Sequence, residues 1–415
     1  MLSLALTALR SRLAISLLVG LSICASMVLL LSVDRIKQAA EEGFAQSISG
    51  VDLLVGARTG ELDLLLYSVF HVGQPVSNIT TQTADDIRAI PMVDWVVPIS
   101  LGDSHKGYRV TATTPEYFSK VKLRNDQVME FSQGRAFQNL NEVVIGSEVA
   151  NALKYALGDK VYLSHGTSGL PGSEHNDFAF EVVGILEPTG TPTDRVLLID
   201  LQGFELIHLG WKSGSKLMSL KGKSVDQIPA ELLESKSVTA LYVGAKSRLQ
   251  LLRLKRSLND YNQEALSAVL PGAALSRMWR LMGTAENSIK VLGWLVLLIS
   301  IVSMVSTSLA SLESRTREMT ILRSLGASPL SLGIMVMIES LIISLTAAVM
   351  AVLLLSYVSA LASGYLSSEF GFTTTQQLIS FEEIKLLMII VLAGLLSSLW
   401  PAWRVYRQQL TKGLA

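Results

Sequence analysis

Charged residues are scarce in this chain, and their two signs balance. Only 17% of the 415 residues are Asp, Glu, Lys or Arg, with 35 basic against 35 acidic side chains, whereas roughly a quarter is usual in soluble domains. A formal net charge of zero excludes the strongly basic surface typical of nucleic-acid-binding proteins, so we expect no nucleic-acid partner. The missing charge is concentrated in four segments, which indicates membrane spans joined to soluble sequence.

Cysteine, compact histidine motifs and a phosphate-binding loop are also missing. The single cysteine, Cys24, lies in an apolar run, so the soluble part has no disulfide and must be held by its own apolar core. The only near match to a P-loop is 222–224, and Leu217 stands where its first glycine should be. The five histidines are scattered; only His165 and His175, with Glu174 and Asp177 nearby, could share a metal. Without compact spacing we expect no metal site, and no set of residues suggests catalysis.

Four long apolar runs cover residues 13–33, 289–312, 330–358 and 384–403. Each holds about 20 or more residues, enough for a helix to cross a hydrocarbon layer about 30 Å thick. The first run is too long for a signal peptide and no small-residue cleavage site follows it, so it is predicted to remain as an anchor. The sequence therefore predicts a four-span membrane protein.

Lys and Arg in the short connections predict how the spans are oriented. Basic residues precede the first span, join the second to the third and follow the fourth: Arg10, Arg12, Arg315, Arg317, Arg323, Arg404, Arg407 and Lys412. The connection between the third and fourth spans instead carries Glu369, Glu382 and Glu383. Because basic connections stay in the cytoplasm, both termini are predicted to be cytoplasmic, and residues 34–286 to lie outside.

The segment 34–286 alternates short strand and helix patterns. Residues 45–125 and 237–285 read as mixed α/β sequence and 126–236 as strand-rich, which predicts an α/β domain with an inserted β-rich subdomain. Within it, Ser147 is a candidate helix N-cap, and a β-α-β unit is expected to end in a strand over 268–274. Residues 287–415 form the third part, with the last three spans.

The connection 313–329 is more than a basic loop. Met319, Leu322 and Gly326 fall on one helical face, with Ile321 and Leu325 beside it, and the segment ends in Gly-Ala-Ser-Pro. Charged residues occupy the other faces: Arg315, Arg317, Glu318 and Arg323. An orientation signal needs charge but no apolar stripe, so we favour a short helix that docks on a cytoplasmic partner over a plain loop.

This segment, followed by Glu339-Ser-Leu in the third span, resembles the coupling segment of MacB/FtsX-like ABC transporter permeases of the mechanotransmission type (type VII). The resemblance continues through Gly134-Arg135, Asn141-Glu-Val-Val-Ile-Gly, Leu157-Gly-Asp and Val182-Val-Gly-Ile-Leu, and through Pro401-Ala-Trp-Arg404 after the last span. It implies a porter-like α/β domain with a β-rich insert and an assembly of two permease copies, or of paralogues, with cytoplasmic ATPase subunits. Only about a dozen residues precede the first span, so the ATPase, which binds the ATP, is expected on a separate chain and this chain is expected to be no enzyme.

Glu339 lies about two turns into the third span, where a carboxylate needs a partner. A structural contact and a role in handling substrate or protons both remain open, and the first is favoured.

Two functions follow from the resemblance. The first is a bacterial inner-membrane permease that converts ATP hydrolysis into export, extraction or hand-over of a substrate outside the cytoplasm. The second is an FtsX-like regulator that activates an extracytoplasmic enzyme without transport. Either would contact membrane lipids, and either could hold an extracytoplasmic partner protein.

Overall fold

The computed structural model describes residues 13–47, 49–123, 127–165, 178–209, 228–229, 232–314, 316–370 and 380–411. The chain divides into two compact units. One contains the long apolar helices and is called the helix bundle here; the other is built on Ala39–Leu281 and is called the α/β domain. Each unit is described by itself below.

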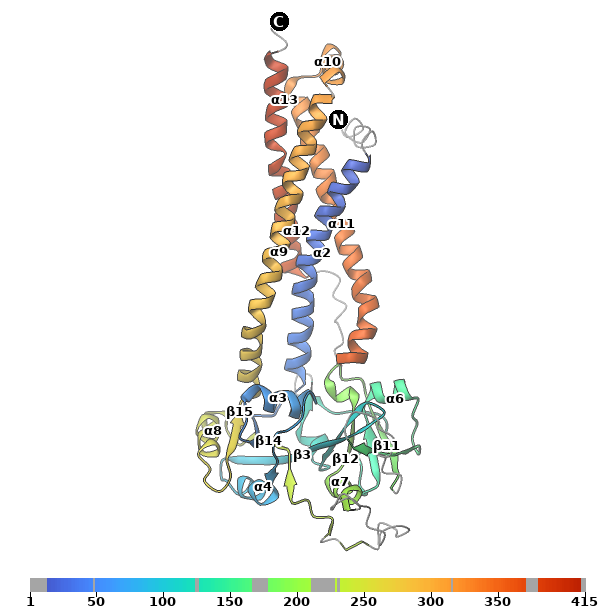
Figure 1. The fold of residues 1–415 in the computed structure, drawn as a ribbon, viewed down its shortest axis with the longest axis vertical. Helices are drawn as coiled ribbons and strands as arrows, with labels where there is room; N and C mark the ends of the chain where they lie inside the picture. The colour runs from blue at the N-terminus through green and yellow to red at the C-terminus, as the bar shows by residue number, and fades with distance from the viewer. Residues whose placement is uncertain are drawn as a thin grey trace. The chain divides into compact units, whose positions relative to one another are not determined.

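The described residues contain four helices that are long and apolar enough to cross a membrane. They are α2 (Leu13–Gln46), α9 (Pro271–Ser314), α11 (Pro329–Phe370) and α12 (Phe381–Ser397), which continues after Ser398 as α13 (Leu399–Thr411) (Figure 1). The four predicted spans are confirmed, and the helices extend past their apolar runs. The short helix α10 (Thr316–Ser324) connects α9 to α11. The start of α2, α10 and the end of α13 lie at the same end of the bundle (Figure 1).

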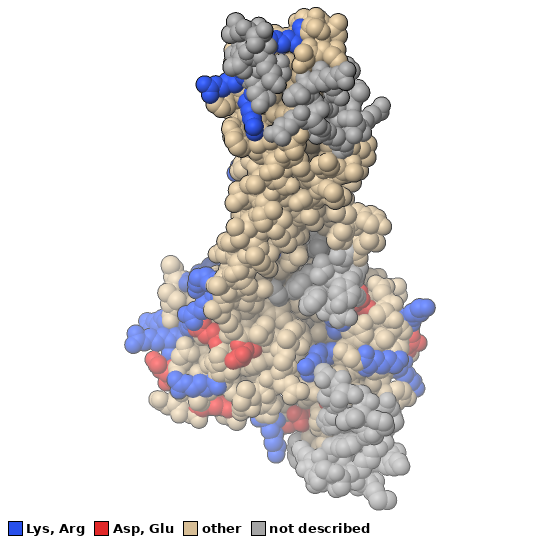
Figure 2. Space-filling model, turned by 45° about the horizontal axis from the view of Figure 1, so that its top comes forward, with Lys and Arg blue, Asp and Glu red and all other residues tan. Residues whose placement is uncertain are grey.

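The interior of the bundle is made by side chains from all four spans. Met27, Met304, Ala351 and Ile390, one from each of α2, α9, α11 and α12, are at most 1% exposed and belong to one apolar cluster. Small residues let the helices approach closely: a Cβ on Gly293 would lie 2.7 Å from the Leu30 side chain. Figure 2 shows the outside of the bundle almost free of charged atoms, as a lipid-facing surface requires.

The α/β domain is organised on an 11-stranded sheet within the described residues. Its main order is β15-β1-β14-β3-β4-β12-β8-β11-β7, with β10 paired to β3 and β9 to β11. The strands are β1 (Leu53–Ala57), β3 (Val93–His105), β4 (Tyr108–Thr113), β7 (Phe131–Gly134), β8 (Glu142–Ile145), β9 (Lys160–Val161), β10 (Ser164–His165), β11 (Phe180–Leu186), β12 (Val196–Asp200), β14 (Ala240–Ala245) and β15 (Leu266–Val269). Two-residue pairs β2 (Ile79–Thr80) with β13 (Ser237–Val238) and β5 (Lys122–Leu123) with β6 (Gln127–Val128) stand apart.

The long strand β3 connects the two halves of this sheet. Its first part pairs with β14 and its last part with β4, and the register shifts between Leu101 and Ser104. The half around β1 and β14 is the mixed one, whereas the half around β8 and β11 is strand-rich. Arg109–Thr113 of β4 pair in parallel with β12, so β4 is hydrogen-bonded to the strand-rich half. The boundary between residues 125 and 126 remains a prediction from the sequence.

Short helices cover the sheet: α3 (Glu61–Val69), α4 (Thr81–Arg88), α5 (Tyr117–Lys120), α6 (Ser147–Leu153), α7 (Leu201–His208) and α8 (Leu251–Asn259), with the 3₁₀ turns η1 (Pro192–Arg195) and η6 (Arg248–Gln250). Three apolar clusters pack between these helices and the strands. Phe137 and Phe180, both 1% exposed, are among their largest buried side chains. These clusters supply the core that a domain without disulfides needs.

Two local predictions are wrong. The N-cap of α6 is Gly146 and Ser147 is its first helical residue; a Cβ on Gly146 would lie 2.3 Å from the Asp194 carbonyl oxygen, so no side-chain cap fits there. The strand expected over 268–274 ends at Val269, because α9 begins at Pro271. Proline is favoured in the first turn of a helix, where its fixed φ fits and its missing N–H is not needed.

Candidate functional site

The turn after α10 gives this short helix a defined end. Gly326 has φ +95°, the left-handed conformation that glycine adopts without strain. Its N–H donates to the Arg323 carbonyl at 2.9 Å, and the Ala327 N–H donates to that of Leu322 at 3.0 Å, the hydrogen-bond pair of a Schellman cap. Ser328 then caps α11 by accepting from the Ser331 N–H at 3.2 Å. The sequence Gly-Ala-Ser-Pro thus ends one helix and begins the next within four residues.

The apolar face of α10 is divided between the bundle and solvent. Met319 is 4% exposed and packs in a cluster with Leu312, Leu332, Val336 and Val405, with the half-buried Leu322 at its edge. Ile321 and Leu325 are instead 53% and 78% exposed. The buried part fixes α10 to its neighbouring helices, and the exposed part is available to a partner.

Beside the exposed part lies an open hollow of about 380 Å³. It is lined by Leu322, Gly326, Ala327, Ser328, Ser331, Leu332 and Met335. Arg323 is half-buried on the same helix. The surface around the end of α10 therefore combines two exposed apolar side chains, one arginine and a hollow large enough for an apolar side chain of another protein.

The remaining residues of the predicted site are less fully described. Arg315 lies outside the described residues, and Arg317 and Glu318 belong to α10 with side chains that the structure leaves undescribed. Glu339 is half-buried in α11 and engages an interaction partner. Its role remains a prediction.

The histidines do not gather in the described part of the chain, where no group of three or more His, Cys, Asp or Glu side chains could hold a metal ion. His165 lies in β10, and Glu174, His175 and Asp177 fall outside the described residues.

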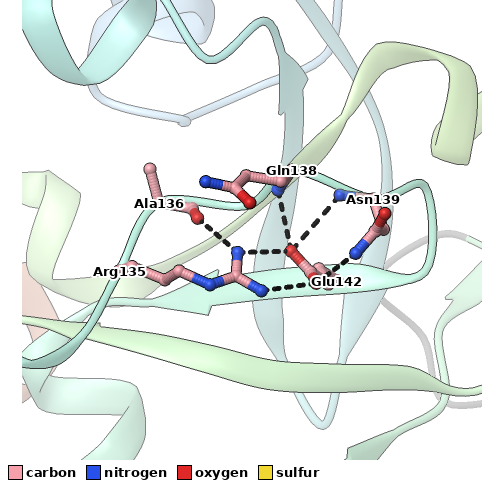
Figure 3. A network of polar contacts seen from close by, with 5 residues as sticks. All are labelled: Arg135, Ala136, Gln138, Asn139 and Glu142. Carbon is pink, nitrogen blue, oxygen red and sulfur yellow. Dashed lines mark hydrogen bonds and ion pairs between the residues drawn. The ribbon is translucent and has the colours of Figure 1, made fainter.

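In the α/β domain, an ion pair that the sequence analysis missed joins two of the quoted motifs. The Arg135 guanidinium donates to both carboxylate oxygens of Glu142 at 2.8 Å, and Glu142 also accepts from the Gln138 and Asn139 N–H groups and the Asn139 side chain (Figure 3). These bonds lower the pKa of Glu142 to about 2, with the Arg135 hydrogen bond as the largest cause. In the sequence, the only sign of this ion pair is that two opposite charges stand seven residues apart. Such a spacing is too common to identify a pair.

Glycines in the same motifs allow the strands to meet. A Cβ on Gly134 would lie 2.0 Å from the Val183 carbonyl oxygen, and one on Gly184 would lie 2.3 Å from that of Arg135. Gly134 also has φ +79°. These positions join β7 to β11 beside β8, so the motif residues build the strand-rich half of the domain.

Comparison with protein families identifies the chain. Residues 14–246 match the MacB-like periplasmic core domain, and residues 290–410 match the FtsX-like permease C-terminal domain. The first match alone covers more than half of the chain. The chain belongs to the MacB/FtsX-like family of ABC transporter permeases. It is therefore an inner-membrane protein with an extracytoplasmic α/β domain, and its family implies an ABC ATPase as a partner.

Two solved structures are similar to parts of this permease. The periplasmic region of MacB from Actinobacillus actinomycetemcomitans is 11% identical, with a TM-score of 0.35, over 56% of this chain and 94% of its own. The extracellular domain of the noncanonic ABC-type transporter YknZ from Gram-positive bacteria is 14% identical, with a TM-score of 0.30, over 52% of this chain and 98% of its own. The comparison with curated proteins gives no match.

We expect Glu142→Gln to destabilise the α/β domain of the permease at neutral pH. Glu142 is buried and its carboxylate accepts five hydrogen bonds; losing the charge-assisted bonds should cost about 2 kcal/mol. The folded-state pKa of about 2 lies below the reference value of 4.5. The carboxylate therefore stabilises the fold fully above about pH 4.5 and loses this effect as the pH falls toward 2.

Denaturant unfolding of residues 34–286 at pH 7 and pH 3 measures this difference. The deficit of Glu142→Gln should be large at pH 7 and smaller at pH 3. Glu181→Gln is the matched control, because Glu181 faces Glu142 on the paired strand but is exposed. Equal stability of Glu142→Gln and wild type at pH 7 would contradict the prediction.

Proposed function

We propose that this permease transmits conformational work from a separate cytoplasmic ATPase to its extracytoplasmic α/β domain, and so exports, extracts or hands over a substrate. The observation that carries the proposal is α9, one uninterrupted helix of 44 residues from Pro271 to Ser314. It begins directly after the sheet strand β15 and ends at the connection to α10. A helix of this length spans about 66 Å at 1.5 Å per residue, more than a hydrocarbon layer requires.

The exposed end of α10 supports the ATPase-binding part of the proposal. Ile321 and Leu325 offer apolar area, Arg323 offers a positive charge, and the hollow beside them can accept an apolar side chain. The buried Met319 and the half-buried Leu322 make α10 move with the helices that it packs on. ATP is bound by the partner, and the ATPase docks on α10 and moves it when nucleotide binds or is hydrolysed.

The distribution of charge supports a cytoplasmic location for this end of the bundle. Lys and Arg atoms reappear there beyond the uncharged belt (Figure 2), and Arg323, Arg404 and Arg407 are among the described basic residues of α10 and α13. Basic residues that flank spans are retained on the cytoplasmic side. This charge distribution supports a cytoplasmic position for both termini. A second permease copy or a paralogue completes the assembly.

An FtsX-like regulator would use the same parts. In that case the α/β domain would activate an extracytoplasmic enzyme, and nothing would be transported. The match of residues 290–410 to the FtsX-like permease C-terminal domain is consistent with this alternative as well.

Purification of the intact complex from its native membrane, followed by mass spectrometry of the proteins and small molecules that accompany it, tests the proposal. An ABC ATPase together with a cargo molecule supports transport. An ABC ATPase together with an extracytoplasmic hydrolase supports the regulator, and absence of any ATPase from the stable complex overturns both.

A further inference from the structure

Charged side chains from three spans meet where their apolar runs end. In the sequence these residues look like ordinary charges at the ends of spans, because they stand at or just outside the ends of the runs 13–33, 289–312 and 384–403. In the bundle they pair across helices. They come from α2 (Asp34, Arg35, Lys37), α9 (Glu286, Lys290) and α12 (Glu383).

Two lysines connect α2 to α9. The Lys290 ammonium lies 2.6 Å from the Asp34 carboxylate and 2.7 Å from that of Glu286, one turn earlier on its own helix. Lys37 lies 3.1 Å from Glu286 on its other side. Charges of α2 and α9 therefore alternate in the order Asp34, Lys290, Glu286, Lys37, with each inner group shared by two partners.

A bidentate ion pair connects α2 to α12. Arg35 donates from Nε to one carboxylate oxygen of Glu383 and from Nη2 to the other, the latter at 3.1 Å. The same carboxylate accepts from the Ser380 N–H at 3.0 Å as part of the capping box that begins α12. The Glu383 side chain is 8% exposed and that of Arg35 19%. The buried Glu383 carboxylate thus caps the N-terminus of α12 and also binds α12 to α2.

The Arg35–Glu383 pair differs from a surface ion pair, because its side chains are 19% and 8% exposed, whereas those of Asp34, Lys37 and Lys290 are 33%, 38% and 31% exposed. Exposed pairs contribute little because water competes for both partners. Breaking a buried pair leaves an uncompensated charge, and planar guanidinium–carboxylate pairing also fixes the relative orientation of the two helices. Helices in lipid lack a hydrophobic drive to associate with each other, so polar contacts near their ends carry more of the specificity.

We propose that these six residues form an electrostatic clasp that makes the ends of α2, α9 and α12 move as one body. Its role in transmission rests on the proposed function, because displacement of α9 would carry α2 and α12 with it. The clasp itself is a property of the bundle and can be tested without the ATPase.

Electron paramagnetic resonance on the full-length permease in lipid nanodiscs tests the clasp. Cys24→Ala removes the single cysteine, and Ile36→Cys and Met388→Cys, at positions 63% and 64% exposed, accept spin labels on α2 and α12. With the clasp intact, the distance between the labels should show one narrow distribution. Arg35→Glu and Glu383→Arg should each broaden it and shift it to longer distances, because each places like charges together.

The double reversal, Arg35→Glu with Glu383→Arg, should make the distribution narrower than in either single reversal, because it restores opposite charges on α2 and α12 while the capping bond from Ser380 stays lost. Glu382→Arg is the matched control, since Glu382 neighbours Glu383 but is 69% exposed and pairs with Lys385 of its own helix; it should leave the distances unchanged. Unchanged distances in both single reversals, or a double reversal no narrower than the single ones, would overturn the clasp. If the wild-type permease shows the narrow distribution and the reversals behave as expected, but the permease binds no ATPase, the proposed function is contradicted and the clasp is supported.

Discussion

Leu325→Asp is expected to reduce recovery of the ATPase with the purified permease by at least tenfold. Leu325 is 78% exposed at the end of α10, so the substitution disturbs little of the internal packing of the permease. Burying a leucine in a partner contributes about 1.5–3 kcal/mol, and an aspartate in the same apolar contact adds an unpaired charge. A loss of 1.4 kcal/mol is already about tenfold in affinity.

Co-purification of the ATPase with tagged permease measures this loss, and membrane insertion is followed in parallel. Leu249→Asp is the matched control, because Leu249 is 95% exposed in the α/β domain. Charge reversal at Arg323 should weaken binding in the same direction. Leu322→Asp, which the sequence singles out, should also reduce binding, but Leu322 is half-buried beside Met319 and its replacement disturbs the packing of α10. Wild-type recovery with Leu325→Asp would show that the ATPase docks elsewhere.

A flexible insert in α9 is expected to disconnect the α/β domain from the ATPase. Six Gly and Ser residues between Gly283 and Thr284 would interrupt the helix, since such residues do not sustain a stiff helical segment. This position lies ahead of Glu286 and Lys290, so the ion pairs of the bundle are spared. ATP hydrolysis by the complex should persist, whereas nucleotide-dependent changes in hydrogen exchange of the α/β domain should disappear.

Two controls separate the effect of flexibility from that of added length and test whether α9 needs glycine at position 283. Seven helix-forming residues at the same place add about two turns, so the faces of α9 stay nearly in register and the response should be retained. Gly283→Ala should also be tolerated, because a Cβ there meets nothing within 4 Å and alanine favours helix. A full nucleotide response with the flexible insert would contradict transmission through a rigid α9.

Features that depend on residues close together in the chain were predictable from the sequence. The apolar runs set the four spans, because lipid accepts a polar backbone only when its hydrogen bonds are satisfied within a helix. The Gly-Ala-Ser-Pro segment set the end of α10 and the start of α11, because Gly326 supplies the left-handed residue and Ser328 the cap. The family resemblance, carried by short motifs, was confirmed by the matches to both domains.

The tertiary structure decided which apolar residues of α10 are buried in the bundle and which are exposed. In the sequence, Met319 and Leu322 share one helical face and Leu325 lies beside it, yet packing buries the first, half-buries the second and leaves the third exposed. The strand expected over 268–274 likewise gave way to α9, because proline at 271 suits a helix start.

Pairs far apart in the chain could not be predicted at all. Arg35 and Glu383 are separated by 348 residues, and only the packing of α2 against α12 brings the guanidinium to the carboxylate. Sequence determined the spans, the turn between α10 and α11 and the family, since these follow from local hydrogen bonding and short motifs. Tertiary structure determined the clasp and the exposed end of α10, since burial and ion pairing depend on which surfaces meet.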